Sequence, residues 1–283
     1  MSSEMQAVSA VVGTAPPAQD EYAIAGGVDG KRRLNLLAEI MRPTTLELFD
    51  MAGVREGQMC VDVGCGGGHA TLDLARIVGP AGRAIGVDFD PAIVALAQED
   101  QLDAGLSNAE FRVGDARSLD DGRYDVAYAR FLLSHVAQPE QVIDRILATL
   151  RPGGTLIVED IDFTGCFCQP DDAAYDRFLE LYTKAVAHGG GDANLGRRLP
   201  TLLRTSALRD VQWRVFQLVH ADGPHKQIQR VTMEKIRPAL LRDQLASETE
   251  IDEILVEMER FAADSSTLVG TPRFVQAYGR LDG

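Results

Sequence analysis

The sequence predicts an α/β fold: a Rossmann-like, seven-stranded, mostly parallel sheet with helices on both faces, an antiparallel last strand and helical lid insertions. Short apolar runs alternate with helical stretches from residue 58 to residue 162, and the first run ends in the glycine cluster "VDVGCGGG" (61–68). Such alternation is typical of βαβ units around a parallel sheet. The rhythm changes after residue 162, which predicts that helical segments interrupt the sheet before its last strand.

The N-terminal part divides into two segments. Residues 1–20 are small, proline-containing and aperiodic, which predicts a disordered tail, and residues 21–56 are expected to form an N-terminal helical cap. Within the cap, apolar residues recur at helical spacing over 31–52. Pro43 is expected to divide this stretch into two helices, because proline lacks the N–H that a helix interior requires.

Residues 57–162 are predicted to be a cofactor-binding core. Glycine and proline mark the ends of its predicted helices: Gly79-Pro80 ends one helix and Pro91 begins the next. The predicted strands cover 58–64, 83–89, 109–115, 124–130 and 154–162, and the predicted helices cover 69–79, 91–105 and 139–150.

Residues 163–283 are expected to supply the remainder of the sheet and a helical lid made from about 163–190 and 225–265. Strands are predicted at 210–220 and 271–281, the last as an added antiparallel edge strand. The apolar residues of this part are expected either in plain core or around an apolar pocket: Phe163, Phe167, Phe178, Tyr182, Ile228, Met233 and Ile236.

Composition narrows the choice of partners. The formal net charge is -14, and such a surface repels nucleic-acid phosphates and anionic lipid, so neither nucleic acid nor membrane is expected as a partner. No basic start precedes an apolar run at the N-terminus, and no 18-residue apolar stretch occurs, so a cytoplasmic location is expected.

The Cys166–Cys168 pair has no neighbouring His or Cys cluster, so no metal site is expected. Monomer and homodimer both stay open.

Residues 57–162 resemble the class I S-adenosylmethionine-dependent methyltransferases, and most nearly their small-molecule ubiquinone/menaquinone branch. "DVGCGGG" (62–68) resembles the acid-and-glycine motif that follows their first strand. "GVDFDP" (86–91) resembles the acidic end of their second strand, and "RVGDAR" (112–117) the end of their third. The stretch from Tyr124 to Asp160, with its "RPGG" turn, resembles their fourth strand, the helix after it and their fifth strand.

The resemblance implies that S-adenosylmethionine is the cofactor and S-adenosylhomocysteine the product. It implies that Asp62 holds the methionine ammonium and that Asp88 accepts the ribose hydroxyls. Phe89 would pack on the adenine, and Arg130 would line the methionine end. The full predicted cofactor set is Asp62, Gly64, Cys65, Gly66, Asp88, Phe89, Asp115, Ala116 and Arg130, with Tyr22 and Arg33 reaching in from the N-terminal cap.

His135 is the candidate catalytic residue. It follows the fourth predicted strand closely, so it is expected near the transferred methyl group, where a histidine can act as a base. The competing interpretation is a helix-face histidine without a chemical role. Glu159 and Asp160, at the end of the fifth predicted strand, are two further candidates for orienting a substrate.

The predicted function is methyl transfer to an O, N or C atom of a small-molecule acceptor that is apolar or resembles a natural product. No Asn/Asp-Pro-Pro-aromatic segment follows the fourth strand, which argues against amino-methylation of DNA or protein amides. Alternatives are an enzyme that keeps the cofactor without transferring a methyl group, such as a cyclase, and a cofactor-sensing module. A dehydrogenase is disfavoured because His69 stands where a dinucleotide-binding loop has its third glycine.

Overall fold

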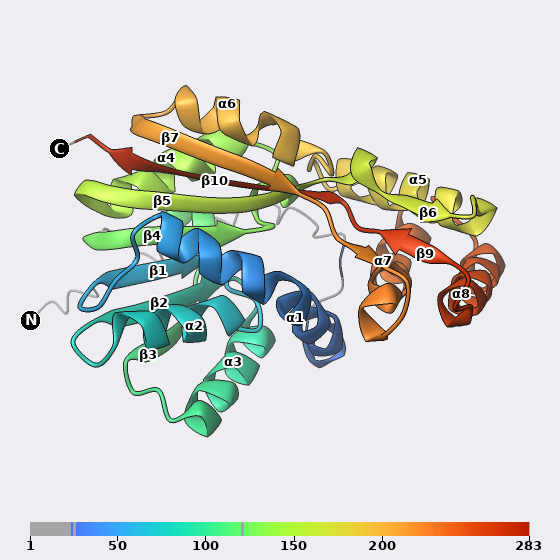
Figure 1. Cartoon of the computed structure of the whole chain (residues 1–283), viewed down its shortest axis with the longest axis horizontal. Coiled ribbons are helices and arrows are strands. Elements are labelled where there is room, and N and C mark those ends of the chain that lie inside the picture. Colours follow the sequence, from blue (N-terminus) through green and yellow to red (C-terminus); the bar gives the residue numbers. More distant parts are fainter. Residues whose placement is uncertain (1–23, 25–26, 120–121, 283) are drawn as a thin grey trace, which may run out of the picture.

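The computed structural model describes residues 24, 27–119 and 122–282 (Figure 1). The predicted tail, residues 1–20, and Tyr22 lie outside the described residues.

A seven-stranded sheet forms the centre of the molecule, as the sequence predicts. Its strand order is β3-β2-β1-β4-β5-β10-β7. The five strands from β3 to β5 are parallel, and β10 runs antiparallel to both of its neighbours. The bounds are β1 (Met59–Val63), β2 (Arg83–Asp88), β3 (Ala109–Val113), β4 (Tyr124–Arg130), β5 (Leu150–Asp162), β7 (Leu208–Phe216) and β10 (Arg273–Leu281).

The expectation that the last strand lies at the edge of the sheet is wrong. β10 lies between β5 and β7, and β7 is the edge strand. Burial gives the reason: Val275 and Ala277 of β10 are buried, whereas Trp213 and Val215 of β7 are 51% and 55% exposed. A strand with apolar residues on both faces is stable inside a sheet, and an alternating one tolerates the edge.

Two predicted strands also differ in extent. β5 begins at Leu150 instead of 154, and its register with β4 shifts between Tyr124 and Val126, which accommodates the "RPGG" segment. The predicted strand 210–220 is two strands, because the chain leaves the large sheet after Phe216. The second of these, β8 (Val219–His220), belongs to a small sheet with the order β6 (Phe167–Gln169), β9 (Leu268–Gly270), β8.

Helices cover both faces of the large sheet (Figure 1). On one face, α1 (Gly27–Met51), α2 (His69–Val78) and α3 (Pro91–Ala104) share a buried apolar cluster with β1, β2 and β4. On the other face, α4 (Pro139–Thr149) and α6 (Leu199–Arg204) share a second cluster with β4, β5 and β10. Short 3-10 helices lie at 116–118, 133–135, 163–165, 195–198 and 224–227.

α1 is one continuous helix, so the predicted break at Pro43 is wrong. Buried residues fix the helix on both sides of the proline: Met41 packs into one apolar cluster and Phe49 into another. Next to the proline, the Thr44 carbonyl accepts from Arg214 Nη2 at 2.8 Å and from Gln276 Nε2 at 3.2 Å, which ties this turn of the helix to β7 and β10. Tertiary packing therefore outweighs the cost of an interior proline, about 3 kcal/mol.

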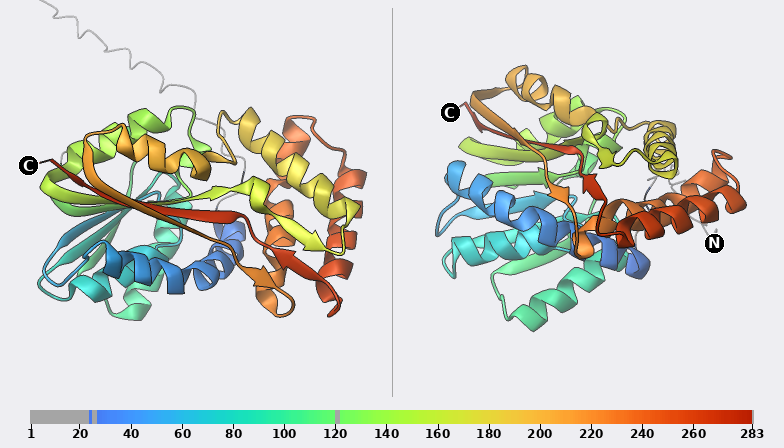
Figure 2. Two further views of the ribbon diagram at one scale, coloured as in Figure 1. Left: turned by 45° about the horizontal axis from the view of Figure 1, so that its top comes forward. Right: turned by 45° about the vertical axis from the view of Figure 1, so that its right-hand side comes forward.

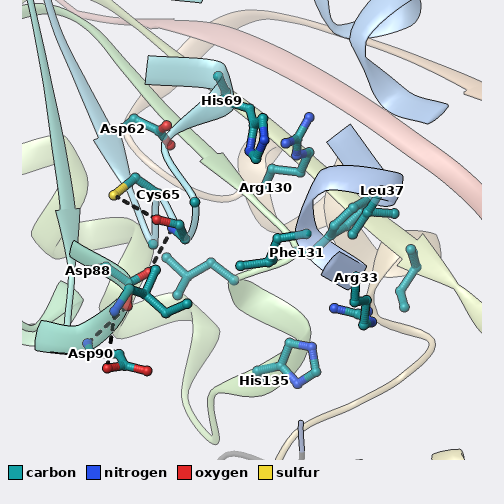
Figure 3. Close-up of a pocket in the computed structure, with 18 of the residues that line it drawn as sticks. Arg33, Leu37, Asp62, Cys65, His69, Asp88, Asp90, Arg130, Phe131 and His135 are labelled. Carbon is teal, nitrogen blue, oxygen red and sulfur yellow. Dashed lines mark hydrogen bonds between the residues drawn. The ribbon is translucent and has the colours of Figure 1, made fainter. Parts of the chain in front are cut away.

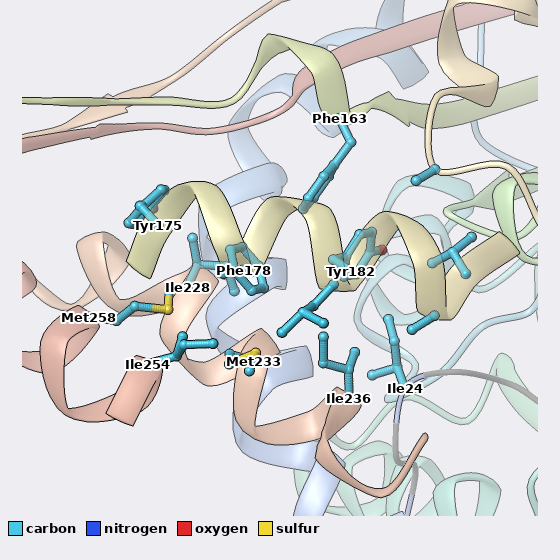
Figure 4. Close-up of a cluster of buried hydrophobic side chains, with 14 of the residues drawn as sticks. Ile24, Phe163, Tyr175, Phe178, Tyr182, Ile228, Met233, Ile236, Ile254 and Met258 are labelled. Atoms are coloured by element: carbon cyan, nitrogen blue, oxygen red, sulfur yellow. The ribbon is translucent and has the colours of Figure 1, made fainter. Parts of the chain in front are cut away.

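Three helices gather beyond one end of the large sheet: α5 (Ala173–His188), α7 (Ile228–Arg242) and α8 (Glu248–Ala263). In both views of Figure 2 the orange and red helices α7 and α8 lie at this end of the sheet. Their apolar faces meet in a third cluster, in which Phe163 stacks on Tyr182 with ring centroids 4.1 Å apart and Met233 and Ile236 are fully buried (Figure 4). No helix in the described part of the chain is long and apolar enough to span a membrane.

The junction between the glycine loop and α2 yields a prediction. Gly68 has φ +79°, and a Cβ built on it would lie 2.6 Å from the Phe111 ring and 3.0 Å from Ala97 Cβ. Gly68→Ala should therefore lower the free energy of unfolding by about 2–4 kcal/mol, through backbone strain and overpacking together. Gly105→Ala is the matched control, because Gly105 has φ +65° with nothing within 4 Å, and only the backbone term of about 1–2 kcal/mol applies. Equal losses in urea denaturation would contradict the account.

Candidate functional site: a cavity at the carboxyl ends of the parallel strands

A cavity of about 690 Å³ lies where β1, β2, β3 and β4 end, between the glycine loop and the helices beyond the sheet (Figure 3). The carboxyl ends of strands are where open α/β sheets bind ligands. The cavity brings together the predicted residues Arg33, Asp62, Gly64, Cys65, Gly66, Asp88, Phe89, Asp115, Ala116, Arg130 and His135.

The glycine loop is fastened to β2 by its own amides. The N–H groups of Gly64 and Cys65 donate to the Val87 carbonyl at 2.8 and 3.1 Å, and the Gly66 N–H donates to Asp88 Oδ2 at 2.9 Å. These three amides are therefore satisfied within the protein. The glycines serve first to let the loop turn with positive φ and to keep its surface free of side chains.

Asp62, at the end of β1, is a buried carboxylate with one direct hydrogen-bonding partner among the described residues. It is 2% exposed, and Thr71 Oγ1 of α2 donates to its Oδ2 at 2.6 Å. Burial raises the pKa of Asp62 to about 6, although the Thr71 hydrogen bond and the charge of Arg130 both lower it. Asp62 thus offers the cavity a negative charge that burial destabilises and that a cation would stabilise.

Asp88, at the end of β2, joins the glycine loop to the turn that begins α3. Besides the Gly66 amide it accepts the Asp90 N–H at 3.0 Å. Burial raises the pKa of Asp88, and its backbone hydrogen bonds oppose that shift. The next residue, Phe89, leaves an apolar ring 57% exposed at the wall of the cavity.

Asp115, just beyond β3, has a partner that the sequence reasoning did not assign. Its carboxylate accepts two donors of the Arg117 guanidinium, with Nη2 at 2.7 Å, and also the Arg117 backbone N–H at 2.8 Å. Hydrogen bonding to Arg117 is the main reason that the pKa of Asp115 lies below its ordinary value. Asp115 and Ala116 still line the cavity, but any ligand donor at Asp115 shares it with Arg117.

Arg130, the last residue of β4, contacts a buried polar network. Its Nη1 lies 3.4 Å from Thr45 Oγ1, and that hydroxyl donates to Glu159 Oε1 at 2.7 Å. Tyr128 OH donates to the same Glu159 oxygen at 2.5 Å. Burial alone would lower the pKa of Arg130, but Tyr128, Glu159 and Asp62 raise it, so the guanidinium is a fixed positive charge facing the cavity near Asp62.

The structure does not support a substrate-orienting role for Glu159 or Asp160. Both are fully buried, and neither belongs to the cavity lining. Glu159 accepts from Thr45, Tyr128 and Gln276. Asp160 accepts the Ser134 N–H at 3.0 Å and so fixes the segment that carries His135. The sequence pattern of β5 could not predict that Glu159 and Asp160 lie outside the cavity, because protein covers both faces of the strand.

His135 and Arg33 line a different part of the cavity from Asp62. Figure 3 shows Leu37 and Phe131 between Asp62 and Arg33, with His135 beyond them. Burial, and next to it the positive charge of Arg33, lowers the pKa of His135 to about 3. The imidazole is therefore neutral at physiological pH. Arg33, which the sequence reasoning placed at the methionine end, lies on the side of His135.

Sequence reasoning missed three polar side chains that shape the site. Thr71 was hidden inside the apolar helix pattern "HATLDLARIVG", although its place, two residues into α2, is a signal that a hydroxyl faces the first strand. Gln229 and Thr232 on α7 also line the cavity. Their role depends on how α7 packs against α1, for which the local sequence carries no signal.

Comparisons with known proteins agree with this geometry. Residues 55–188 match the model of a family described as "Methyltransferase domain". The chain is 30% identical over 140 residues to the ubiquinone/menaquinone biosynthesis C-methyltransferase UbiE of Azotobacter vinelandii, a match that covers 48% of this chain and 53% of that protein. Residues 55–188 are therefore similar in sequence to methyltransferase domains.

Solved structures extend the likeness of the fold beyond the methyltransferase domain. The YcgJ protein of Bacillus subtilis is 18% identical with a TM-score of 0.57, covering 86% of this chain and 99% of that one. The [4+2]-cyclase SpnF is 21% identical with a TM-score of 0.53, covering 85% of this chain and 81% of that one. At these identities the likeness concerns the fold. The chain spans about half the length of the curated relatives it matches.

The buried Asp62–Thr71 hydrogen bond yields a prediction. Thr71→Val should lower the free energy of unfolding by about 1.5–3 kcal/mol at pH 8, where Asp62 is ionised and its hydrogen bond is charge-assisted. At pH 5, below the pKa of about 6, Asp62 is largely protonated in the folded state and the loss should shrink. Thr149→Val is the control, because Thr149 Oγ1 is equally buried but donates to the neutral Ile146 carbonyl. A Thr71→Val loss that is as independent of pH as that of Thr149→Val would refute the charge-assisted bond.

Proposed function

We propose that the chain is an S-adenosylmethionine-dependent methyltransferase that transfers a methyl group to an O, N or C atom of a small molecule. One observation carries the proposal: Asp62, Asp88 and Asp115, at the ends of three neighbouring parallel strands, line one cavity together with the glycine loop. The methyltransferase domain and the UbiE likeness support it.

The residues present suit S-adenosylmethionine. Asp62 would accept the methionine ammonium, since its buried carboxylate has no direct cationic partner among the described residues. Asp88 would accept the ribose hydroxyls while it holds the Gly66 amide. The exposed ring of Phe89 would pack on the adenine, whose amine would reach Asp115 beside Arg117. Arg130, fixed by its buried network, would face the methionine carboxylate.

When bound, this cofactor supplies an electrophilic methyl group on a sulfonium, so the protein mainly positions the acceptor and excludes water. The apolar rings of Phe131, Phe163 and Phe178 line the rest of the cavity and serve that purpose. His135 is neutral, but its pKa of about 3 makes it a weak base. We therefore assign His135 to orienting the acceptor as a hydrogen-bonding partner.

The segments beyond the sheet complete the proposed site. Phe163, Phe178, Tyr182 and Ile228 contact the cavity and would cover a bound acceptor as a lid. Met233 and Ile236 are core residues of α7, and Phe167, which is 42% exposed, lies outside the cavity. Of the seven expected apolar residues, four thus line the cavity, two pack in the core and Phe167 does neither.

A cofactor-retaining enzyme that transfers no methyl group is the alternative, because the same fold occurs in a protein named a [4+2]-cyclase and a fold does not decide a reaction. Product analysis separates the two. The protein is incubated with methyl-labelled S-adenosylmethionine and a panel of apolar phenols, enols and amines, with Asp88→Ala in parallel. Labelled product and equimolar S-adenosylhomocysteine that depend on Asp88 support transfer. An isomerised product without S-adenosylhomocysteine supports the alternative.

Cofactor binding should depend on pH through Asp62. Because an ammonium favours the ionised carboxylate, affinity for S-adenosylhomocysteine should be constant above pH 7 and fall about tenfold by pH 5 as Asp62 protonates around its pKa of about 6. Calorimetry in buffers of different ionisation enthalpy should show proton release near pH 6.

Asp160→Asn is the matched control, since Asp160 also has a pKa of about 6 but lies outside the cavity. It should keep the pH dependence, whereas Asp62→Asn should weaken binding and flatten the curve. A flat wild-type curve between pH 5 and pH 7 would speak against Asp62 as the ammonium partner.

A further inference from the structure

The part of the cavity remote from the glycine loop carries polar groups that the cofactor does not require. We call it the acceptor chamber, bounded by Leu37, Phe131, Phe163, Phe178, Tyr182 and Ile228. Its walls are mostly apolar, and α1 and α7 meet along one side. Arg33 and Gln229 also line it. An apolar pocket with a few placed polar groups selects its ligand through those groups.

Arg33 brings an uncompensated positive charge into the chamber. Its Nε donates to Thr232 Oγ1 at 3.1 Å, and that hydroxyl donates to the Ile228 carbonyl at 2.8 Å, so α7 fixes the guanidinium in place. Among the described residues no carboxylate lies within 4 Å of Arg33. Arg42, two turns later on α1, shows the ordinary alternative, because both its Nε and its Nη2 are paired with Asp73.

Gln229 adds a side-chain oxygen that can accept a hydrogen bond but has no donor in the described part of the chain. It is 3% exposed, its Nε2 lies 3.4 Å from the Gly270 carbonyl, and its Oε1 accepts no hydrogen bond in the described part of the chain. The contact with the carbonyl fixes which end of the amide is the oxygen. Gln229 and Thr232 are three residues apart on α7 and so share one helix face. Buried side-chain oxygens are normally satisfied, so this one points to a ligand donor.

Arg33 and Gln229 together indicate the kind of molecule that the acceptor chamber binds. A fixed guanidinium without a carboxylate partner binds an oxyanion, and in apolar surroundings that attraction is stronger than in water. His135 also lines the cavity on the side of Arg33. An O–H or N–H group of the same ligand would satisfy the unpartnered Gln229 oxygen.

We propose that the acceptor is an apolar molecule with an acidic oxygen (a phenol, an enol or a carboxylic acid) bound as its anion by Arg33, and with a hydrogen-bond donor that reaches Gln229 Oε1. The inference deepens the proposed function and rests on it, because the chamber continues into the cavity assigned to the cofactor. It also reassigns Arg33 from the cofactor to the acceptor.

The test uses naphthalene probes titrated into the full chain by calorimetry at pH 8, after saturation with S-adenosylhomocysteine. We expect 2-naphthoate to bind at least tenfold more tightly than the uncharged 2-naphthamide. Arg33→Gln should abolish that difference. Arg32→Gln is the matched control, because Arg32 is the exposed neighbour on the same helix, and it should preserve the difference.

Gln229 is tested with a second pair of probes. 6-Hydroxy-2-naphthoate should bind several-fold more tightly than 2-naphthoate, and Gln229→Leu should remove that gain without lowering the melting temperature, because it also removes a buried unsatisfied oxygen. A purely structural Gln229 would instead lose stability and leave the preference between the probes unchanged.

The outcomes separate the two levels of the proposal. Equal binding of 2-naphthoate and 2-naphthamide, no binding of either, or equal losses in Arg33→Gln and Arg32→Gln would overturn the acceptor class. A chain that does not bind S-adenosylhomocysteine in the first titration refutes the proposed function instead, and the naphthoate titration still reports on the chamber.

Discussion

The site depends on one constraint: a carboxylate, Asp62, is buried at the end of the central strand β1, where it has a hydroxyl partner and a nearby guanidinium but open cavity on its remaining side. The sheet makes this arrangement possible, because β1 lies between β2 and β4 and is covered on both faces. Removing the carboxylate from water without neutralising it leaves a charge that a cationic ligand group stabilises. The glycine loop, α2 and Arg130 are all arranged around that charge.

A second polar centre, Glu159, supports the first from inside the sheet. It collects hydrogen bonds from Thr45 of α1, Tyr128 of β4 and Gln276 of β10. The network therefore ties the N-terminal helix and the last strand to the strand that carries Arg130. Buried networks of this kind specify one arrangement when every member is satisfied. Through Thr45, the network also fixes the continuous helix α1, which contains Pro43, against the face of the sheet.

The core of the fold was predictable because its determinants are local. Apolar runs that end in "DVGCGGG", "VDFD" and "VGDA" carry both the strand and the acid that follows it, and parallel strands bring those acids to one edge. The parts that were not predictable depend on distant neighbours. Pro43 is tolerated because Met41 and Phe49 fix α1 in two separate apolar clusters, and the place of β10 follows from burial on both faces.

The chemistry of the acceptor side depends in the same way on tertiary contacts. Arg33 lies in the chamber because Thr232, 199 residues further along, fixes it, and the Gln229 oxygen is significant only because nothing in the described fold satisfies it. Different side chains of one cavity thus face the proposed cofactor and the proposed acceptor. Acids at strand ends face the proposed cofactor, and a guanidinium held between two helices faces the proposed acceptor.

The most direct measurement is a crystal structure of the full chain with S-adenosylhomocysteine. The account predicts the homocysteine ammonium within hydrogen-bonding distance of Asp62, the ribose hydroxyls on Asp88 and the sulfur facing the chamber that holds Arg33 and His135. A ligand bound with its adenine in that chamber and its amino group away from Asp62, or a cavity that stays empty at saturating ligand, would contradict it.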